Sequence, residues 1–140
     1  MSYLQYSETK KESAALIRCP FKGCNARVIP TKSLQTVKVA NSPQMTSLNE
    51  KDTHTEFYQV NDVWDFDNIG VSRPSDELEQ PTITTASGDE LEIAVQRLLI
   101  CSECDRGPLG FAGISSGDDE KDHKNLKYFL SCTSVLYEQK

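Results

Sequence analysis

Four cysteines fall into two short-spaced pairs, a pattern that is typical of a metal site. Cys19 and Cys24 form a C-x4-C pair, and Cys101 and Cys104 form a C-x2-C pair. Tetrahedral zinc takes four ligands, and sites made of four cysteines usually consist of two such pairs, each folding a turn around the ion. Four thiolates leave no open position for water, so the predicted site holds one structural Zn²⁺ with Cys19, Cys24, Cys101 and Cys104 as ligands.

The two pairs are far apart in the chain. Residues 25–100 lie between them, whereas a compact zinc ribbon has about 15–20 residues there. The metal is therefore expected to join two remote parts of one domain. By analogy with a cross-link, closing such a loop stabilises the fold by up to about 4–5 kcal/mol. A thioredoxin-like redox pair is the alternative, but the βαβ pattern that it requires is missing.

Composition limits the class of protein. The chain has five cysteines and no run of the roughly 18 apolar residues that a membrane span needs, and it does not start with an apolar leader. We expect a cytoplasmic protein, in which cysteines favour metal over disulfides. The net charge of −6 argues against nucleic acid as a partner, because phosphate binding requires a basic surface. Nothing indicates self-association, so a monomer is expected.

The pattern of residues predicts a mainly β fold with long irregular loops. We expect a flexible tail at 1–14 and one zinc-binding β domain at 15–140, with surface loops at 72–89 and 115–125. Segments rich in branched and aromatic residues favour strands. The expected strands are Arg27–Pro30, one around Thr36–Val39, Glu56–Phe66, Leu91–Ile100, and an antiparallel hairpin of Leu109–Ile114 with Leu126–Tyr137.

The stretch NDVWDFDNIG, residues 61–70, combines acidic and large apolar side chains. In a strand, Trp64 and Phe66 would share one face, and Val63, Asp65 and Asp67 the other. One interpretation is an aromatic core face with a solvated acidic face. The other is an exposed surface in which apolar anchors beside charges bind a partner. The pattern alone leaves both open.

VWDFDNIG, followed after a gap by LLICSECDRGPLGF, resembles the Rab-interacting factor family, small zinc-binding proteins that engage Rab GTPases of the secretory pathway. The resemblance implies antiparallel sheets that form a tent-like half-barrel clamped by zinc. It implies a regulator without covalent catalysis, which binds nucleotide-free Rab, promotes GDP release and acts as a chaperone in vesicle transport. The GTPase would also bring it to the periphery of secretory membranes.

The same resemblance implies a GTPase-binding surface. Its residues in this chain are Val63, Trp64, Asp65, Phe66, Asp67, Asn68 and Glu103. The chain departs from the family pattern in three places. Its first cysteine pair is C-x4-C where C-x2-C is expected in animal members, Glu103 stands where aspartate is expected, and 72–89 looks like an insertion of the fungal kind.

Two other classes of protein stay open. One is an enzyme similar to the B-type methionine sulfoxide reductases, with Cys132 as nucleophile. Against it, FLSCTS lacks the Arg-Tyr expected before the cysteine, Ser134 replaces an expected asparagine, and His123 lies in a polar loop. A cysteine in a strand is usually buried and inert. The other class is a structural zinc-binding subunit of a larger assembly, which the acidic composition permits.

Overall fold

The computed structural model describes residues 3–9, 14–21, 23–32, 34–40, 45–48, 55–60, 66–71, 81–84, 88, 90–115 and 127–139. Within these residues the chain forms ten strands, two short 3-10 turns and no α-helix. This confirms the predicted mainly β class. All strand pairs are antiparallel, so each strand can bury one face and expose the other.

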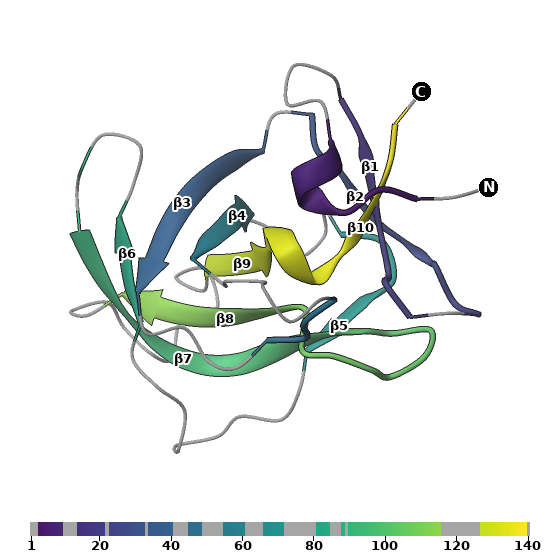
Figure 1. Ribbon diagram of the computed structural model, residues 1–140. Helices are drawn as coiled ribbons and strands as arrows, with labels where there is room; N and C mark the ends of the chain where they lie inside the picture. Colours follow the sequence, from purple (N-terminus) through teal and green to yellow (C-terminus); the bar gives the residue numbers. More distant parts are fainter. Residues whose placement is uncertain are drawn as a thin grey trace.

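Six strands close into a barrel (Figure 1). Their order is β6-β3-β4-β9-β8-β7, and the ring closes because β7 pairs with both β8 and β6. A seventh strand, β5, pairs with the end of β7. The bounds are β3 Gln35–Ala40, β4 Glu56–Val60, β5 Ile69–Val71, β6 Thr82–Thr84, β7 Glu90–Cys101, β8 Gly110–Ser115 and β9 Lys127–Ser131.

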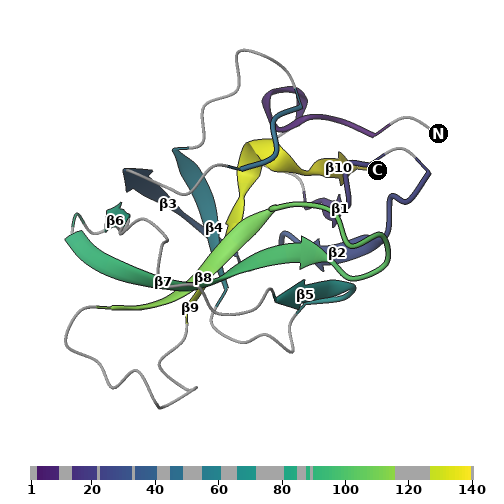
Figure 2. The same cartoon turned by 90° about the horizontal axis from the view of Figure 1, so that it is seen from below.

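A second, three-stranded sheet lies at one side of the barrel (Figure 2). It consists of β1 Leu16–Arg18 between β2 Arg27–Pro30 and β10 Leu136–Glu138. The outer edge of β10 is not open, because Leu4 and Tyr137 exchange two backbone hydrogen bonds of 2.8 Å. The N-terminal segment thus covers an edge that could otherwise pair with another chain.

Alternation along the strands produces two buried clusters. In β4, Phe57 points to one cluster and Tyr58 to the other, and in β9 the same holds for Phe129 and Leu130. Because side chains alternate across a sheet, one cluster fills the barrel and the other lies between the barrel and the three-stranded sheet. The barrel cluster has members from all six strands: Val37, Val39, Met45, Phe57, Ile83, Ile93, Val95, Phe111 and Phe129.

A β-bulge in β7 determines which of the two buried clusters each half of this long strand faces. The register against β8 shifts between Val95 and Arg97. Before the shift, Ile93 and Val95 point into the barrel; after it, Leu99 and Cys101 point into the other cluster. An extra residue in one strand reverses the alternation that follows. The bulge therefore directs the end of β7 towards the three-stranded sheet.

Several sequence predictions are confirmed, namely strands at Arg27–Pro30, around Thr36–Val39 and at Leu91–Ile100, and the hairpin that β8 forms with β9. Other predictions differ from the structure. The strand predicted at Leu126–Tyr137 is wrong as one element, because a 3-10 turn at Cys132–Ser134 interrupts it. This turn sends β10 into the other sheet.

The predicted loop at 72–89 is wrong at its centre, where β6 completes the barrel between β3 and β7. A three-residue strand gives too short a pattern to detect, and its place depends on both neighbours. The strand predicted at Glu56–Phe66 is confirmed as far as Val60; Phe66 lies outside any strand, and 61–65 lie outside the described residues. The prediction of a surface loop at 115–125 falls almost wholly outside them.

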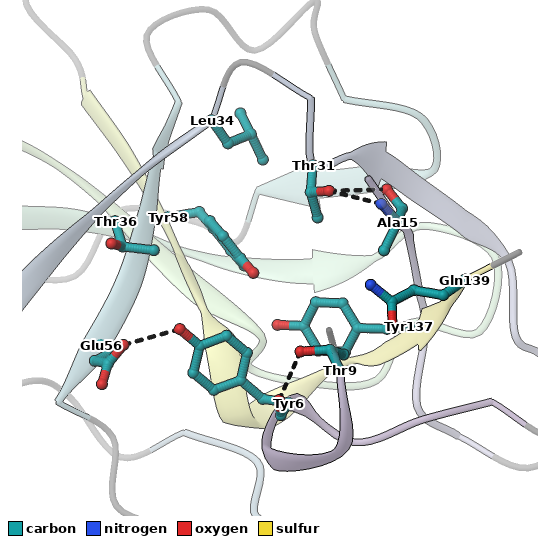
Figure 3. Close-up of a pocket in the computed structure, with 10 residues that line it drawn as sticks. All are labelled: Tyr6, Thr9, Ala15, Thr31, Leu34, Thr36, Glu56, Tyr58, Tyr137 and Gln139. Carbon is teal, nitrogen blue, oxygen red and sulfur yellow. Dashed lines mark hydrogen bonds between the residues drawn. The ribbon is translucent and has the colours of Figure 1, made fainter. Parts of the chain in front are cut away.

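The predicted flexible tail at 1–14 is wrong for residues 3–9. Besides the Leu4 bridge, a 3-10 turn at Tyr6–Glu8 places the Tyr6 ring 5.9 Å from that of Tyr137 (Figure 3). Polar composition suggested a tail, but two apolar residues are enough to attach this segment to β10. The assignment of 15–140 to a single domain stays a prediction.

Close approach of two barrel strands requires glycine at residue 110. A Cβ atom there would collide with the backbone carbonyl oxygen of Phe129 in β9, whereas one at Gly70 would make an ordinary contact with Ile100 at 3.8 Å. We predict that Gly110→Ala lowers the free energy of unfolding by about 1–3 kcal/mol, because the backbone must move. Gly70→Ala, the control, should change it by less than about 0.5 kcal/mol. Urea unfolding followed by circular dichroism measures both; equal effects would contradict the close approach.

Candidate metal centre and the adjoining surface

The structure brings the four predicted cysteines together. Their sulfur atoms all lie within 4.8 Å of one another and could hold a metal ion. The Sγ atoms of Cys19 and Cys104 are 3.7 Å apart, and those of Cys24 and Cys101 are 3.6 Å apart. A tetrahedral site with metal–sulfur distances of about 2.3 Å requires sulfurs about 3.8 Å apart, whereas a disulfide requires about 2.05 Å. The spacing fits metal coordination.

The first pair sits on the turn that joins β1 to β2. Cys19 directly follows β1, and its N–H donates to the carbonyl of Ala26 over 2.9 Å. Gly23 has φ +87° and Asn25 has φ +49°, a region that glycine and asparagine tolerate best. The Asn25 side chain also donates to the Cys19 carbonyl over 2.9 Å. These left-handed residues turn the chain so that Cys24 faces Cys19.

The second pair sits where β7 ends. Cys101 is the last residue of β7, and its N–H donates to the Arg106 carbonyl over 3.0 Å. The N–H of Asp105 donates back to the Cys101 carbonyl over 2.8 Å, and Asp105 has φ +57°. This turn places Cys104 beside Cys101. Since the bulge has already aimed Cys101 at the three-stranded sheet, both pairs meet between the sheet and the barrel.

Burial makes an uncompensated thiolate cluster unfavourable. Cys19 and Cys101 are fully buried, and burial raises the pKa of each thiol. At Cys24 burial also raises the pKa, but the N–H of Ala26 and the neighbouring thiols outweigh it, so its pKa is lowered. Burial disfavours the charged form, and a nearby cation favours it. A bound metal ion would supply that cation.

A surface hollow adjoins the cysteines. It has a volume of about 360 Å³ and is lined by both turns and by Asn68, which directly precedes β5. Its residues are Gly23, Cys24, Ala26, Asn68, Glu103 and Cys104. Two residues that the sequence assigns to one binding surface, Asn68 and Glu103, therefore line the same hollow although 34 intervening residues separate them. The cysteine turns form the rest of its wall.

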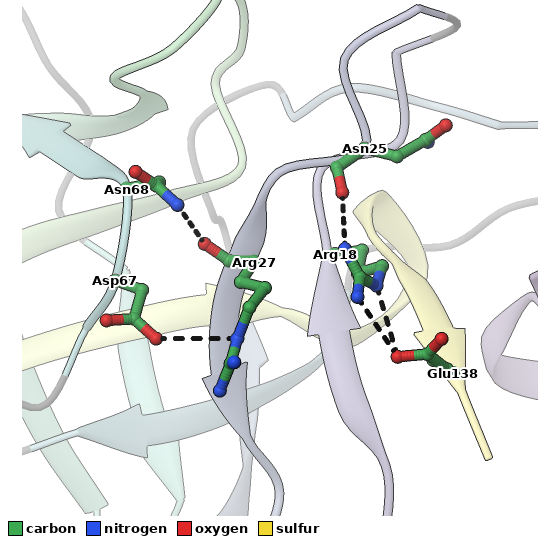
Figure 4. Close-up of polar contacts among 6 residues, drawn as sticks. All are labelled: Arg18, Asn25, Arg27, Asp67, Asn68 and Glu138. Carbon is green, nitrogen blue, oxygen red and sulfur yellow. Dashed lines mark hydrogen bonds and ion pairs between the residues drawn. The ribbon is translucent and has the colours of Figure 1, made fainter. Parts of the chain in front are cut away.

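The segment before β5 is fixed between β2 and the second turn (Figure 4). The Asp67 N–H donates to the Val28 carbonyl over 2.6 Å, and the Asn68 side chain donates to the Arg27 carbonyl over 3.0 Å. The Asn68 carbonyl accepts from the Ser102 N–H over 2.9 Å. Because Asn68 has φ +44°, its backbone turns sharply here. The hollow thus has a rigid wall on this side.

The other residues of the predicted GTPase-binding surface differ in exposure and in the contacts that they make. Asp67 is exposed, and its carboxylate lies 3.9 Å from the Arg27 guanidinium. Phe66 is half-buried and packs edge-on against Tyr128, with 6.2 Å between ring centroids. Phe66 therefore anchors the segment to the barrel. Val63, Trp64 and Asp65 lie outside the described residues.

Two arginines near the cysteines were not predicted from the sequence. Arg27 pairs with Asp67, and Arg106 lies with its guanidinium 5.6 Å from the centre of the Phe21 ring. Each directly adjoins a cysteine turn, which is the signal that could have identified them. They add positive charge to a rim that otherwise carries acidic residues.

The structure does not support Cys132 as a nucleophile. Its side chain has no exposed area, and it lies in the cluster between the barrel and the three-stranded sheet. Tyr137 donates a 2.6 Å hydrogen bond to the Cys132 carbonyl and fixes the turn around it. A catalytic thiol must be accessible to its substrate. His54 and His123 lie outside the described residues.

Neither of the 3-10 turns in the described part of the chain has the length or apolar character to cross a membrane.

Comparison with known proteins shows the family to which this chain belongs. The family model described as "Mss4 protein" matches residues 13–137. Over 136 residues the chain is 27% identical to "Protein DSS4" of Saccharomyces cerevisiae, covering 84% of this chain and 92% of that protein. Over 119 residues it is 28% identical to the "Guanine nucleotide exchange factor MSS4 homolog" of Schizosaccharomyces pombe, covering 84% and 93%. The resemblance to the Rab-interacting factors is thereby confirmed, and this chain belongs to the Mss4 protein family.

Proposed function

We propose that this protein is a guanine-nucleotide exchange factor and chaperone for a Rab-type small GTPase. Family membership and a relative named as an exchange factor support this function. The structural observation that supports this function is the hollow beside the cysteines, which Asn68 and Glu103 both line. The protein acts in vesicle transport, in the cytoplasm and at secretory membranes to which its GTPase binds.

Release of a nucleotide needs no covalent step from the exchange factor. A protein that binds the empty GTPase more tightly than the loaded one shifts the equilibrium towards nucleotide release. The hollow provides a surface for such binding because hydrogen bonds to β2 and to the second turn fix its Asn68 wall. A rigid surface loses little conformational freedom when it docks, so more of the contact energy remains to oppose nucleotide binding.

The charge of this surface disfavours phosphate. Asp67 and Glu103 are exposed beside the hollow, and four thiolates around one divalent ion add about two negative charges. Together these outnumber the two positive charges of Arg27 and Arg106 at the rim. Nucleotide phosphates would be repelled, whereas lysines and arginines of a GTPase would be attracted. The acidic surface thereby selects the state of the partner from which the nucleotide has left.

Zinc is the metal that the donor set fits best. Four cysteine sulfurs at tetrahedral spacing match structural zinc sites, which are closed to water and do no chemistry of their own. In this role the ion clamps the β1–β2 turn to the end of β7 and keeps two walls of the hollow at a fixed separation. One structural Zn²⁺ per chain is proposed.

Charge reversal at the hollow should slow exchange. We predict that Asp67→Lys with Glu103→Lys slows GDP release at least about tenfold, about 1.4 kcal/mol, because it repels basic residues of the GTPase. The measurement is release of a fluorescent GDP from a panel of Rab proteins, together with gel filtration of the complex with phosphatase-stripped Rab. Chelators are avoided because they would also remove zinc.

Glu90→Lys with Glu92→Lys makes the same charge change on exposed positions of β7, far along the strand from Cys101, and serves as the matched control. It should retain exchange. The proposed function is wrong if no Rab protein responds to the unaltered protein, or if the folded variant at residues 67 and 103 remains as active as the control.

Metal content should depend on four of the five cysteines. We predict about one zinc per chain, and its loss in Cys24→Ser, because three thiolates hold zinc much less tightly than four. Losing the clamp should lower the free energy of unfolding by up to about 4–5 kcal/mol. Elemental analysis and urea unfolding measure these effects.

Cys132→Ala is the control, since this thiol lies in the core and not among the four. It should lower stability through its lost packing but leave one zinc per chain. Zinc that survives Cys24→Ser and disappears in Cys132→Ala would contradict the ligand assignment.

A further inference from the structure

A second cavity lies at the other end of the three-stranded sheet. Its volume is about 310 Å³, near the lower limit for small-ligand pockets. In β1 and β2 the residues next to the cysteine turn are Arg18 and Arg27, whereas Ala15 and Thr31, beyond the opposite strand ends, line this cavity. The hollow near Asn68 and this cavity therefore have no residue in common.

Three tyrosines from distant parts of the chain form much of its lining (Figure 3). Tyr6 comes from the N-terminal turn, Tyr58 from β4 and Tyr137 from β10. The ring of Tyr6 stands edge-on to that of Tyr58 at 6.3 Å, and Tyr58 stands edge-on to Tyr137 at 6.5 Å. Rings set at an angle around one space can turn part of their faces towards it, and aromatic faces attract cations. The Tyr137 hydroxyl does not take part, because it donates to the Cys132 carbonyl.

Among the described residues, a single carboxylate, Glu56, completes the lining, and no lysine or arginine takes part in it. The Tyr6 hydroxyl donates to one Glu56 oxygen over 2.9 Å, which holds the carboxylate at the cavity. Thr31 fixes the opposite wall, because its hydroxyl accepts from the Ala15 N–H over 2.8 Å and donates to the Ala15 carbonyl. Apart from Leu34 the remaining lining is polar and uncharged, so Glu56 gives the cavity its negative character.

This environment raises the pKa values of Tyr6 and Tyr58. Burial raises the pKa of Tyr58 to about 12 and raises that of Tyr6 further, and the Glu56 carboxylate acts in the same direction on both. Their hydroxyls therefore stay protonated at neutral pH. Burial disfavours a charge of either sign, whereas the Glu56 carboxylate disfavours only additional negative charge, so the carboxylate is the group that would favour a cation here.

Lys38 already forms an ion pair with Glu56 and would compete with any cation that enters the cavity. Its ammonium lies 3.0 Å from the second carboxylate oxygen, but 68% of the lysine side chain is exposed. Ion pairs at such exposed positions are weak, and a carboxylate has about four acceptor sites. An incoming cation can therefore share Glu56 with Lys38 or replace it without breaking the Tyr6 hydrogen bond.

We propose that this cavity binds an organic cation, an ammonium or guanidinium group, between the tyrosine rings and the Glu56 carboxylate. The cation is either the basic side chain of a partner polypeptide or a small free organic cation such as choline. Both offer the same chemistry, a positively charged nitrogen group bonded to apolar carbon. The carboxylate supplies the charge, and the rings supply faces that replace part of the cation's hydration.

Nuclear magnetic resonance titration of the complete zinc-loaded protein tests this directly. The probes are N-acetyl-arginine methylamide, N-acetyl-lysine methylamide, choline, and the uncharged N-acetyl-norleucine methylamide. Cationic probes should shift the backbone signals of Thr36 and Tyr58 at concentrations of about 1–20 mM, and the norleucine probe should not. Tighter binding of choline identifies a small amine, and tighter binding of the arginine or lysine probe identifies a polypeptide. Equal shifts with norleucine, or none with any probe, would overturn the proposal.

Two substitutions act in opposite directions and sharpen the test. Glu56→Gln keeps an oxygen for the Tyr6 hydrogen bond and should weaken cation binding about tenfold. Lys38→Gln removes the competitor and should strengthen binding about two- to fivefold. Zinc content should stay unchanged in both variants, because neither residue lies at the metal centre. Unchanged affinity in both folded variants would rule out Glu56 as the binding group.

A second pair of variants separates the contribution of the Tyr6 ring from that of its hydroxyl. Tyr6→Phe retains the aromatic face and should keep at least about half of the affinity, whereas Tyr6→Leu should lose about threefold or more. If leucine binds the cations as well as phenylalanine does, the attraction is a property of the carboxylate alone and the proposed tyrosine cage is wrong.

Discussion

The meeting of four cysteine sulfur atoms at one point is the constraint on which the candidate binding surface depends. Cys19 and Cys24 belong to the three-stranded sheet and Cys101 and Cys104 to the barrel, so a metal held by all four joins the two units. Without it, the described contacts that attach the sheet are its apolar face, the hydrogen bonds between β2 and the segment before β5, and the chain itself. The hollow has walls from both units. Its shape is therefore only as fixed as their connection, which is why a closed metal site would matter to this surface even without taking part in any reaction.

Backbone geometry brings the cysteines and the surface residues to one place. Three non-glycine residues in the described part of the chain have positive φ, namely Asn25, Asn68 and Asp105. Two follow a cysteine of the metal centre, and the third lies in the segment between β2 and the second turn. Left-handed backbone costs free energy for most residues, and asparagine and aspartate tolerate it best. All three lie among or directly beside the residues that line the hollow, so these turns determine the shape of this surface.

The sequence predicts what short-range patterns determine. Paired cysteines at two- and four-residue spacing identified the candidate ligands, and branched residues identified β7. What it missed depends on contacts between distant residues. Thr82–Thr84 becomes a strand only because β3 and β7 leave room for it, and the break at Cys132 follows from β10 pairing with β1. The tyrosine cavity is the extreme case, because Tyr6, Tyr58 and Tyr137 share no spacing pattern and meet only after both sheets are assembled.

The two candidate sites have the same sign of charge and a fixed separation. Ala15 and Cys19 bound β1, and four residues of extended chain span about 13 Å. A standard protein interface covers about 800 Å² on each partner, which is large enough to include both ends of so short a sheet. A GTPase docked at the hollow could therefore also place a basic side chain in the tyrosine cavity. For this reason only isolated small cations can reveal the intrinsic preference of the cavity, because a whole partner would report on both sites at once.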